Sequence, residues 1–336
     1  TGSGKTHTTV GRLGVPDSGA GRGRDAPPGA GNPPRDDGLV MRGARRLFKC
    51  IGGDAAASLP GAHYSISASF AEIYNAPGAV NECICDLLNP DAGHLQVRHT
   101  PKQGFFIADL NVVDCGNAAD VRAVLEAGVQ NRRVGAHALN KDSSRSHALF
   151  TLYINSEEAA GPSGSDGARP VKRYGKISFV DLAGSERLKE SCAEGNARKE
   201  TQAINKSLFT LGQVILQLAQ GKTGKHVPYR NSKLTQLLQE SFGGESLCLM
   251  VTCISPASTF AEESTNSLNY AQKAMNIQNR PVVKLDEHQQ ALRDLREENR
   301  ALRRELEGYH ARYGVLPGSE LGPVAESRGG TAAFGA

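Results

Sequence analysis

The chain has 336 residues, of which 39 % are hydrophobic and 22 % charged, with a formal net charge of +4; this composition predicts a globular protein with one large domain and appendages. Its seven cysteines form no C-x-x-C pair and have no histidine partners at zinc spacing, so we expect reduced thiols rather than a zinc site. No window is long and apolar enough for a membrane span, and the mild positive charge does not by itself indicate nucleic acid as a partner.

The first residues, TGSGKT, match the end of the phosphate-binding pattern G-x-x-x-x-G-K-[ST]. In such a loop, backbone N–H groups and a helix N-terminus face the phosphates, the lysine adds a positive charge and the threonine hydroxyl ligates Mg²⁺. We therefore expect Lys5 and Thr6 to bind the outer phosphates of a nucleotide and its Mg²⁺. A glycine- and serine-rich turn before a helix is the alternative interpretation of this short pattern alone.

Residues 11–37 are rich in Gly, Pro, Arg and Asp, cannot bury a core, and predict a long surface loop. The periodicity after it predicts a helix at 39–48, and the β-branched and aromatic residues of 63–74 predict a strand. A second helix is predicted at 120–132, with valines and a leucine along one face.

Two strands at 148–155 and 176–184, separated by a Gly/Pro/Ser-rich tip, predict a hairpin. Apolar residues spaced by four and three from Ile204 to Leu218 predict an amphipathic helix against a core. The nearly continuous apolar run 247–255 predicts a strand covered on both faces, and 260–278 predicts another helix. Strands alternating with helices behind a phosphate loop predict a three-layer α/β fold with a mostly parallel central sheet.

Two further motifs carry chemistry: NKDSSRSH at 140–147 and DLAGSE at 181–186. Asp181, at the end of an apolar strand, could hold the Mg²⁺ shell, and the Gly184 N–H could meet a γ-phosphate. Arg145 and Glu186 have opposite charges and could form a latch that closes around nucleotide. Taken separately, a solvated serine-rich turn and a tight turn after a strand are the alternatives.

These motifs, with INKSL (204–208), HVPYRNSKLTQLL (226–238) and SLNYAQKA (267–274), resemble the motor domain of a kinesin. The resemblance runs from residue 1 to about 286 and implies a P-loop NTPase fold that binds ATP and Mg²⁺. It implies that 140–147 is switch I and 181–186 is switch II, which relax upon hydrolysis.

The resemblance also implies roles for individual residues. The catalytic set would be Arg145, Glu186, Ser144 and Gly184, with the Arg145–Glu186 pair helping to polarise the attacking water. The nucleotide-binding set would be Thr1, Gly2, Ser3, Gly4, Lys5, Thr6, His7, Asn140, Ser143 and Asp181. Mg²⁺ would be held by Thr6, Ser144 and, through water, Asp181.

A basic segment from 221 to 239 contains no acidic residue, which suits an acidic partner. A solvated loop and helix face, or a nucleic-acid surface, are the alternatives, although no nucleic-acid motif is present. The resemblance implies that this segment faces tubulin and that the helix from Ile204 relays motion beside it. The expected microtubule-binding residues are Lys222, Lys225, His226, Arg230 and Lys233.

Four regions follow from this reading: a motor domain at 1–277, a neck linker at 278–286, a coiled-coil neck at 287–313 and a disordered tail at 314–336. The neck has a heptad pattern with Asn299 at a core position, a residue that favours two-stranded coils, so we expect a homodimer. A lone surface helix is the alternative. The heptad residues are Leu292, Leu295, Asn299, Leu302, Leu306, Tyr309 and Tyr313.

Three departures from the family pattern are visible, and one of them is the long low-complexity loop at 11–37 after the first helix. The strands and helix that precede a kinesin phosphate loop have no counterpart in the printed sequence, so we expect a sheet that lacks its first strands. In addition, EIYN (72–75) reaches the next motif, DLL, only after an insertion at 76–85.

We therefore expect a microtubule-stimulated ATPase that moves along microtubules, located in the cytoplasm on the cytoskeleton, with no nucleic-acid partner. The alternative is a kinesin-like fragment that binds microtubules without productive turnover, because the start of the phosphate loop is missing. A signalling GTPase is disfavoured, since no N/TKxD signature lies at a suitable place.

Overall fold

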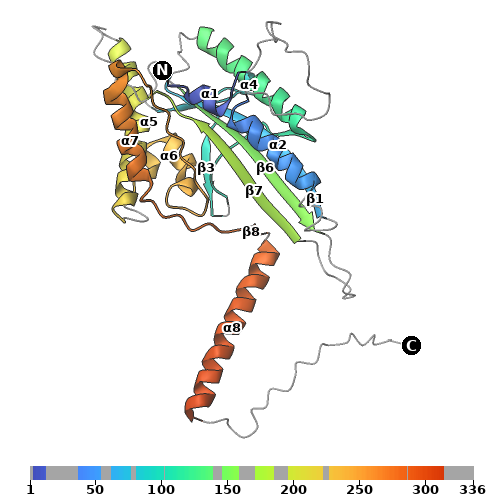
Figure 1. The fold of residues 1–336 in the computed structure, drawn as a ribbon. Helices are drawn as coiled ribbons and strands as arrows, with labels where there is room; N and C mark the ends of the chain where they lie inside the picture. Colours follow the sequence, from blue (N-terminus) through green and yellow to red (C-terminus); the bar gives the residue numbers. More distant parts are fainter. Residues whose placement is uncertain are drawn as a thin grey trace, which may run out of the picture. The chain divides into compact units, whose positions relative to one another are not determined.

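A computed structural model describes residues 3–12, 37–53, 62–76, 81–101, 103–138, 146–158, 171–184, 196–221, 227–285 and 287–313 (Figure 1). The chain forms two compact units, residues 1–284 and 285–336. The predicted tail at 314–336, the hairpin tip and most of the low-complexity loop lie outside the described residues.

The first unit is built on a sheet of three long strands, β1 (Ala62–Tyr74), β6 (His147–Glu158) and β7 (Val171–Asp181). Short strands β2 (Cys83–Asp86) and β5 (Val113–Asp114) pair with β1, and β8 (Lys284–Leu285) completes the order β2-β1-β6-β7-β8. The prediction of a mostly parallel sheet is wrong for the described pairs. The pairings β1–β2, β1–β5, β1–β6 and β6–β7 are all antiparallel. Only β1–β2 and β6–β7 join strands that are consecutive in the chain, as in a hairpin.

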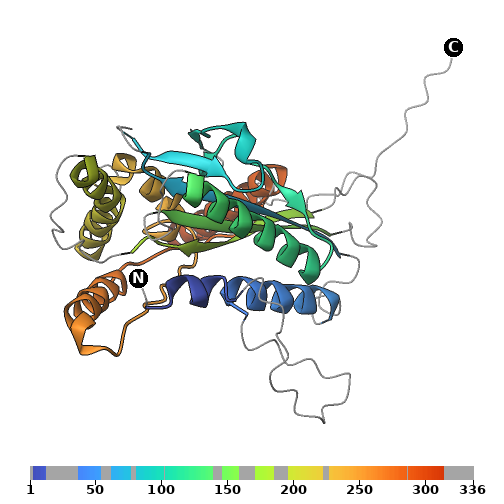
Figure 2. The same ribbon diagram turned by 90° about the horizontal axis from the view of Figure 1, so that it is seen from above.

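Helices cover both faces of this sheet (Figure 2). One layer holds α1 (Lys5–Thr9), α2 (Leu39–Gly52) and α4 (Ala118–Ala138). The other holds α5 (Asn196–Ala219), α6 (Lys233–Leu237) and α7 (Ala261–Ala274). The predicted three-layer α/β fold is therefore confirmed, and the predicted helices and hairpin strands recur with longer or shorter ends.

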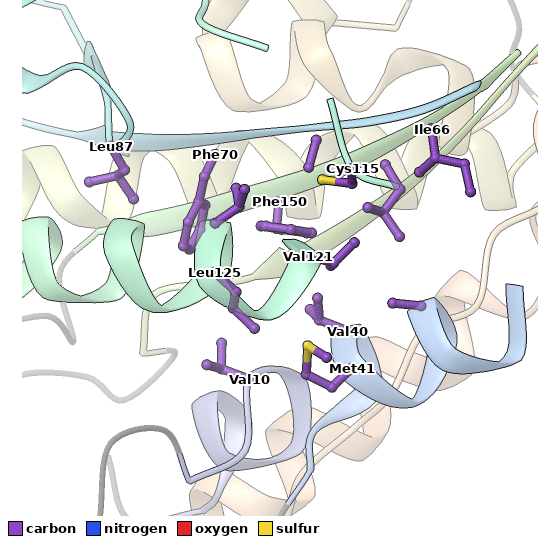
Figure 3. Packing of buried hydrophobic residues seen from close by; sticks show 14 of the residues in the cluster. Val10, Val40, Met41, Ile66, Phe70, Leu87, Cys115, Val121, Leu125 and Phe150 are labelled. Carbon is purple, nitrogen blue, oxygen red and sulfur yellow. The ribbon is translucent and has the colours of Figure 1, made fainter. Parts of the chain in front are cut away.

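The alternation of side chains along the strands divides the core into two clusters. On β1, Phe70 faces α4 and α2, whereas Ile73 faces α5 and α6. Phe70 and Phe150 pack edge to face with ring centroids 5.3 Å apart in the first cluster (Figure 3). Gly128 of α4 lies directly on Phe70, where a Cβ would come within 2.2 Å of the ring, so this glycine allows α4 to approach the sheet closely.

The segment 247–255, predicted to be a buried strand, is not a strand in the structure. Leu247 and Leu249 are 86 % and 85 % exposed. A strand needs a hydrogen-bonding neighbour, and no described strand pairs with this segment. The apolar run alone therefore did not determine its conformation.

The remaining elements of the first unit are short. The ribbon β3 (Val97–Thr100) and β4 (Gly104–Ile107) forms a separate two-stranded sheet. Single 3-10 turns occur at Pro90–Ala92, Tyr229–Asn231, Gln239–Ser241 and Ser258–Phe260. The insertion predicted at 76–85 overlaps strand β2, because Cys83 pairs with Tyr74. The residues that connect β1 to β2 are therefore 75–82.

The second unit contains one described helix, α8 (Glu287–Tyr313), which confirms a helix where the heptad pattern lies. Leu295, Leu302 and Tyr309 are 61 %, 57 % and 56 % exposed in the single chain. Asn299 accepts a hydrogen bond from the Arg303 Nε at 2.8 Å. None of the described helices is long and apolar enough to cross a membrane.

Candidate nucleotide site

The described part of the phosphate-loop motif, residues 3–6, leads into a helix. Gly4 has a φ of 86°, which is a left-handed conformation that favours glycine, and its carbonyl accepts the Thr8 N–H at 2.8 Å. Helix α1 begins immediately afterwards at Lys5. The half-buried Lys5 and the adjacent Thr6 therefore start a helix, and the N–H groups at a helix N-terminus are suited to bind an anion.

Thr6 lies against the end of β7. Its hydroxyl donates a hydrogen bond to Asp181 Oδ2 at 2.7 Å, so the structure brings together two residues 175 positions apart. Asp181 is only 4 % exposed, and its Oδ1 has no hydrogen-bond partner among the described residues. A hydroxyl oxygen beside a buried, incompletely paired carboxylate is a donor set that fits a hard cation such as Mg²⁺.

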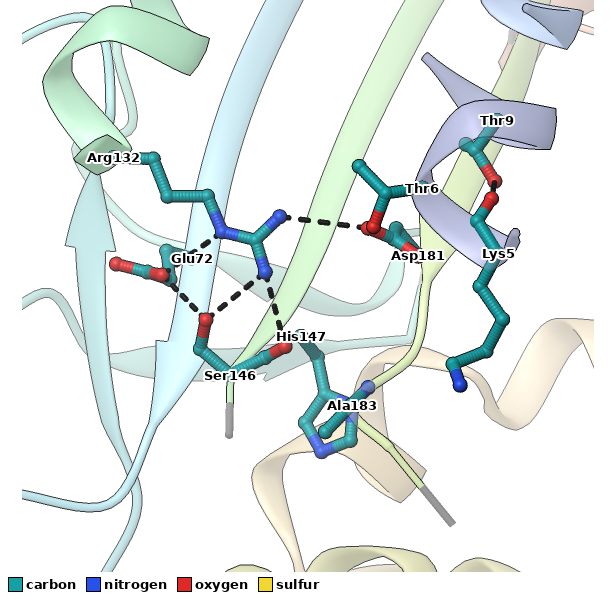
Figure 4. A network of polar contacts seen from close by, with 9 residues as sticks. All are labelled: Lys5, Thr6, Thr9, Glu72, Arg132, Ser146, His147, Asp181 and Ala183. Atoms are coloured by element: carbon teal, nitrogen blue, oxygen red, sulfur yellow. Dashed lines mark hydrogen bonds and ion pairs between the residues drawn. The ribbon is translucent and has the colours of Figure 1, made fainter. Parts of the chain in front are cut away.

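A buried arginine that the sequence analysis missed links the Thr6–Asp181 contact to the rest of the sheet (Figure 4). Arg132 of α4 donates from Nε to Glu72 Oε1 at 3.1 Å and from Nη1 to Asp181 Oδ2 at 3.5 Å. Its Nη2 also donates to the Ser146 carbonyl and hydroxyl oxygens at 3.1 and 3.0 Å. Ser146 in turn donates its hydroxyl proton to Glu72 at 2.6 Å.

Strand register explains how one guanidinium reaches both acids. Glu72 and Asp181 are each the partner of Ala148, from opposite sides, so the three residues form one rung across β1, β6 and β7. Ala148 has a small side chain on the same face of the sheet. The space between the two carboxylates is therefore free for Arg132, which extends the stripe of Val121, Leu125 and Gly128 on α4. The position of Arg132 on the apolar face of α4 was the feature of the sequence that could have indicated a buried charge.

His147 lies on the opposite face of the same sheet. Its Nδ1 accepts the Ala183 N–H at 2.9 Å, so Nε2 carries the ring proton and donates to Ser207 Oγ at 2.8 Å. Burial, with a smaller contribution from Arg132, lowers the pKa of His147 from 6.5 to about 4. The neutral imidazole, at the start of β6, therefore links two other parts of the chain: Ala183, which follows β7, and Ser207 of helix α5.

The burial of neutral His147 predicts an acid-dependent loss of stability. The unfolded chain binds a proton near pH 6.5 and the folded chain only near pH 4, so the free energy of unfolding should fall by about 3 kcal/mol across this window. Urea unfolding at several pH values between 7 and 4 measures this slope. His147→Gln should flatten this slope. An equal slope in His147→Gln and the wild type would contradict the assignment.

The structure describes only some of the residues predicted for the site. Ser3, Gly4, Lys5, Thr6, His7, Asp181 and Gly184 are described, and of these Thr6 and Asp181 are in direct contact. The exposed His7 makes no side-chain hydrogen bond with a described residue. Outside the described part lie Thr1, Gly2, Asn140, Ser143, Ser144, Arg145 and Glu186.

The structure describes two of the five residues predicted for the partner surface. Arg230 is exposed in the turn Tyr229–Asn231, and Lys233 is half-buried at the start of α6. Lys222, Lys225 and His226 lie outside the described residues.

Comparison with known proteins gives a consistent result. The family described as the kinesin motor domain matches residues 1–277. The chain is 38 % identical over 309 residues to the Kinesin-like protein KIN-12D of Arabidopsis thaliana, covering 91 % of this chain and 10 % of that protein. It is 39 % identical over 284 residues to the Chromosome-associated kinesin KIF4B of Homo sapiens, covering 84 % of this chain and 21 % of that protein. The chain thus spans a small part of these relatives.

Solved structures agree with the sequence comparison. A structure of a fast kinesin matches with a TM-score of 0.69 and 32 % identity, over 85 % of this chain and 71 % of that one. A KIF14 dimer in a two-heads-bound state, with AMP-PNP and in complex with a microtubule, matches with a TM-score of 0.68 and 32 % identity, over 88 % and 74 %. The match of the family across residues 1–277 shows that this chain belongs to the kinesin motor domain family.

Proposed function

We propose that this chain is an ATP-dependent microtubule motor domain, a microtubule-stimulated ATPase that couples hydrolysis to movement along the filament. The observation that supports it most directly is the contact between the Thr6 hydroxyl and Asp181, which joins the phosphate loop to the DLAGSE motif. Kinesin motor domains bind nucleotide. The solved KIF14 relative was captured on a microtubule with AMP-PNP, an ATP analogue.

In this proposal, backbone N–H groups of residues 1–7 and the Lys5 ammonium hold the phosphates. Thr6, Ser144 and, through water, Asp181 would hold Mg²⁺, which would supply positive charge to the phosphate oxygens. The nucleotide-binding set also includes Asn140 and Ser143.

The reacting groups belong to the two switch motifs. Gly184 donates its N–H to the γ-phosphate, and the Arg145–Glu186 pair closes the site and orients the attacking water. Arg132 holds Asp181 and the Ser146 end of switch I in place from α4. Ordering and release of these segments link hydrolysis to motion.

Microtubules are the proposed partner, through a basic surface that includes Arg230 and Lys233 together with Lys222, Lys225 and His226. Tubulin is acidic, and a surface of one sign of charge favours fast association with it. This partner places the protein on the microtubule cytoskeleton.

We propose a motor domain at 1–277, a neck linker at 278–286 and a neck at 287–313 that pairs two chains. The exposed heptad residues of α8, among them Leu295, Leu302 and Leu306, support pairing because a partner helix would bury them. Asn299 at a core position favours a two-stranded coil.

Turnover of Mg·ATP by the purified chain, with and without microtubules, tests the proposal. We expect microtubules to raise the rate strongly and Glu186→Ala to abolish the stimulation. Glu126→Ala, an exposed carboxylate on α4, is the matched control and should keep full stimulation. A chain that is folded and binds microtubules but shows no stimulated turnover would overturn the enzymatic part of the proposal.

A further inference from the structure

A buried carboxylate at the end of the β1–β2 connection reaches a distant helix. Tyr74 pairs with Cys83, so residues 75–82 connect the two strands, and Glu82 is the last of them. Glu82 is only 7 % exposed. Its partners are Ser232 and Lys233, about 150 positions later in the chain. A buried glutamate needs such partners, because an unpaired buried charge is costly.

Glu82 and the capping residue Ser232 together accept hydrogen bonds from the first backbone N–H groups of helix α6. Glu82 Oε1 accepts the Ser232 hydroxyl proton at 2.6 Å, and Oε2 accepts the Lys233 N–H. Ser232 Oγ accepts the Leu234 N–H at 3.2 Å. The first N–H groups of a helix have no partner within the helix, so here one is satisfied by the cap and one by Glu82.

Helix α6 in turn holds the turn that presents Arg230. The buried Thr235 hydroxyl donates to the Tyr229 carbonyl at 2.6 Å, and Gln236 Nε2 donates to the Arg230 carbonyl at 3.1 Å. The Tyr229 hydroxyl donates to the Phe242 carbonyl at 2.6 Å. The backbone of the basic turn is thus fixed to α6, while the Arg230 side chain stays exposed.

The cations of this segment have no acidic partner within the described part of the chain. Neither Arg230 nor Lys233 forms an ion pair there, and Glu82 bonds the Lys233 backbone rather than its ammonium group. The carboxylate therefore fixes the segment without neutralising its side chains through a direct ion pair.

We propose that Glu82 is a positioning residue for microtubule binding: it fixes the start of α6 so that Arg230 and Lys233 face an acidic filament in a set arrangement. This inference rests on the proposed function for the identity of the partner. The mechanical part, that Glu82 fixes α6, does not depend on it.

The substitution Glu82→Gln distinguishes the effect of fixing α6 from the effect of the negative charge, because the two predict opposite changes in microtubule affinity. The amide can accept from only one of the two donors, and its own NH₂ would face the other, so the start of α6 should loosen. The same change removes a negative charge, which on electrostatics alone would strengthen binding to an acidic filament. We expect the opposite, a Kd for microtubules raised about fivefold to tenfold in co-sedimentation at fixed salt.

The matched control is Glu126→Gln, which removes the same charge from α4 in the other helical layer. Its Kd should equal that of the wild type or be slightly lower. In an Arg230→Ala background, Glu82→Gln should lose most of its effect, because the two changes would act on the same contact. A Kd for Glu82→Gln equal to or below that of Glu126→Gln would overturn the inference.

Amide hydrogen exchange distinguishes the two possible failures. Without microtubules, the Lys233 amide should exchange faster in Glu82→Gln than in the wild type, while amides of β6 should be unchanged. A wild-type chain that does not bind microtubules would overturn the proposed partner, and faster exchange would still support the fixing of α6. Unchanged exchange at Lys233 would overturn the positioning role itself.

Discussion

Arg132→Met is expected to lower the free energy of unfolding by about 3–5 kcal/mol, because it leaves buried charges without their partner. Glu72 and Asp181 are 9 % and 4 % exposed, and Arg132 is the cation that contacts both. Methionine keeps the length and apolar stem of the side chain, so the loss should come from charge and hydrogen bonding rather than from a cavity. Urea unfolding at pH 7 measures it.

Two variants test the cause of that loss. Arg133→Met, at an exposed position next along the same helix, should change stability by less than about 0.5 kcal/mol. Adding Glu72→Gln to Arg132→Met should recover part of the lost free energy of unfolding, because one of the two buried carboxylates without a partner is removed. An Arg132→Met protein as stable as the wild type would show that water or other groups solvate the carboxylates of Glu72 and Asp181. The Arg132 network would then not be needed for the stability of this site.

Local patterns in the sequence were sufficient for most elements of the fold. The spacing of apolar residues predicted α2, α4 and α5, because each packs an apolar face against the sheet. The β-branched and aromatic residues predicted β1, and the hairpin pattern predicted β6 and β7. These features depend on neighbours in the chain, and the sequence contains them directly.

Features that depend on distant partners were predicted less well. The residues of 247–255 have the composition of a buried strand, yet no described strand lies beside them, and they form no regular element. The hairpin prediction gave the antiparallel β6–β7 pair, but the antiparallel pairing of β1 with β6 was missed, because these strands are distant in the chain.

The site divides in the same way. Thr6 and Asp181 were predicted because their motifs have a characteristic residue order, and the structure places their side chains 2.7 Å apart. Arg132 was missed because its partners come from β1, β7 and the residue before β6, which only the strand register brings together. Glu82 was included in an insertion for the same reason, since its partners lie far along the chain.

Asp181→Asn is expected to weaken the dependence of nucleotide binding on Mg²⁺ and to lower microtubule-stimulated turnover by about 10²–10³-fold. The substitution keeps the shape of the side chain but removes the negative charge beside the Thr6 hydroxyl. It also replaces a carboxylate oxygen by an NH₂ group, which cannot accept a hydrogen bond from water on a cation. Titration of Mg²⁺ against binding of a fluorescent ADP analogue measures the first effect independently of catalysis.

Hydroxyl variants on α1 provide the controls for this prediction. Thr6→Val should reproduce the loss of Mg²⁺ dependence, whereas Thr6→Ser keeps the hydroxyl and should resemble the wild type. Thr9→Val removes a hydroxyl from the same helix that donates to the Lys5 carbonyl at 3.1 Å and does not contact Asp181, so it should bind normally. If Asp181→Asn kept the wild-type Mg²⁺ dependence, the Thr6–Asp181 contact would be a structural link between α1 and β7 rather than part of a cation site.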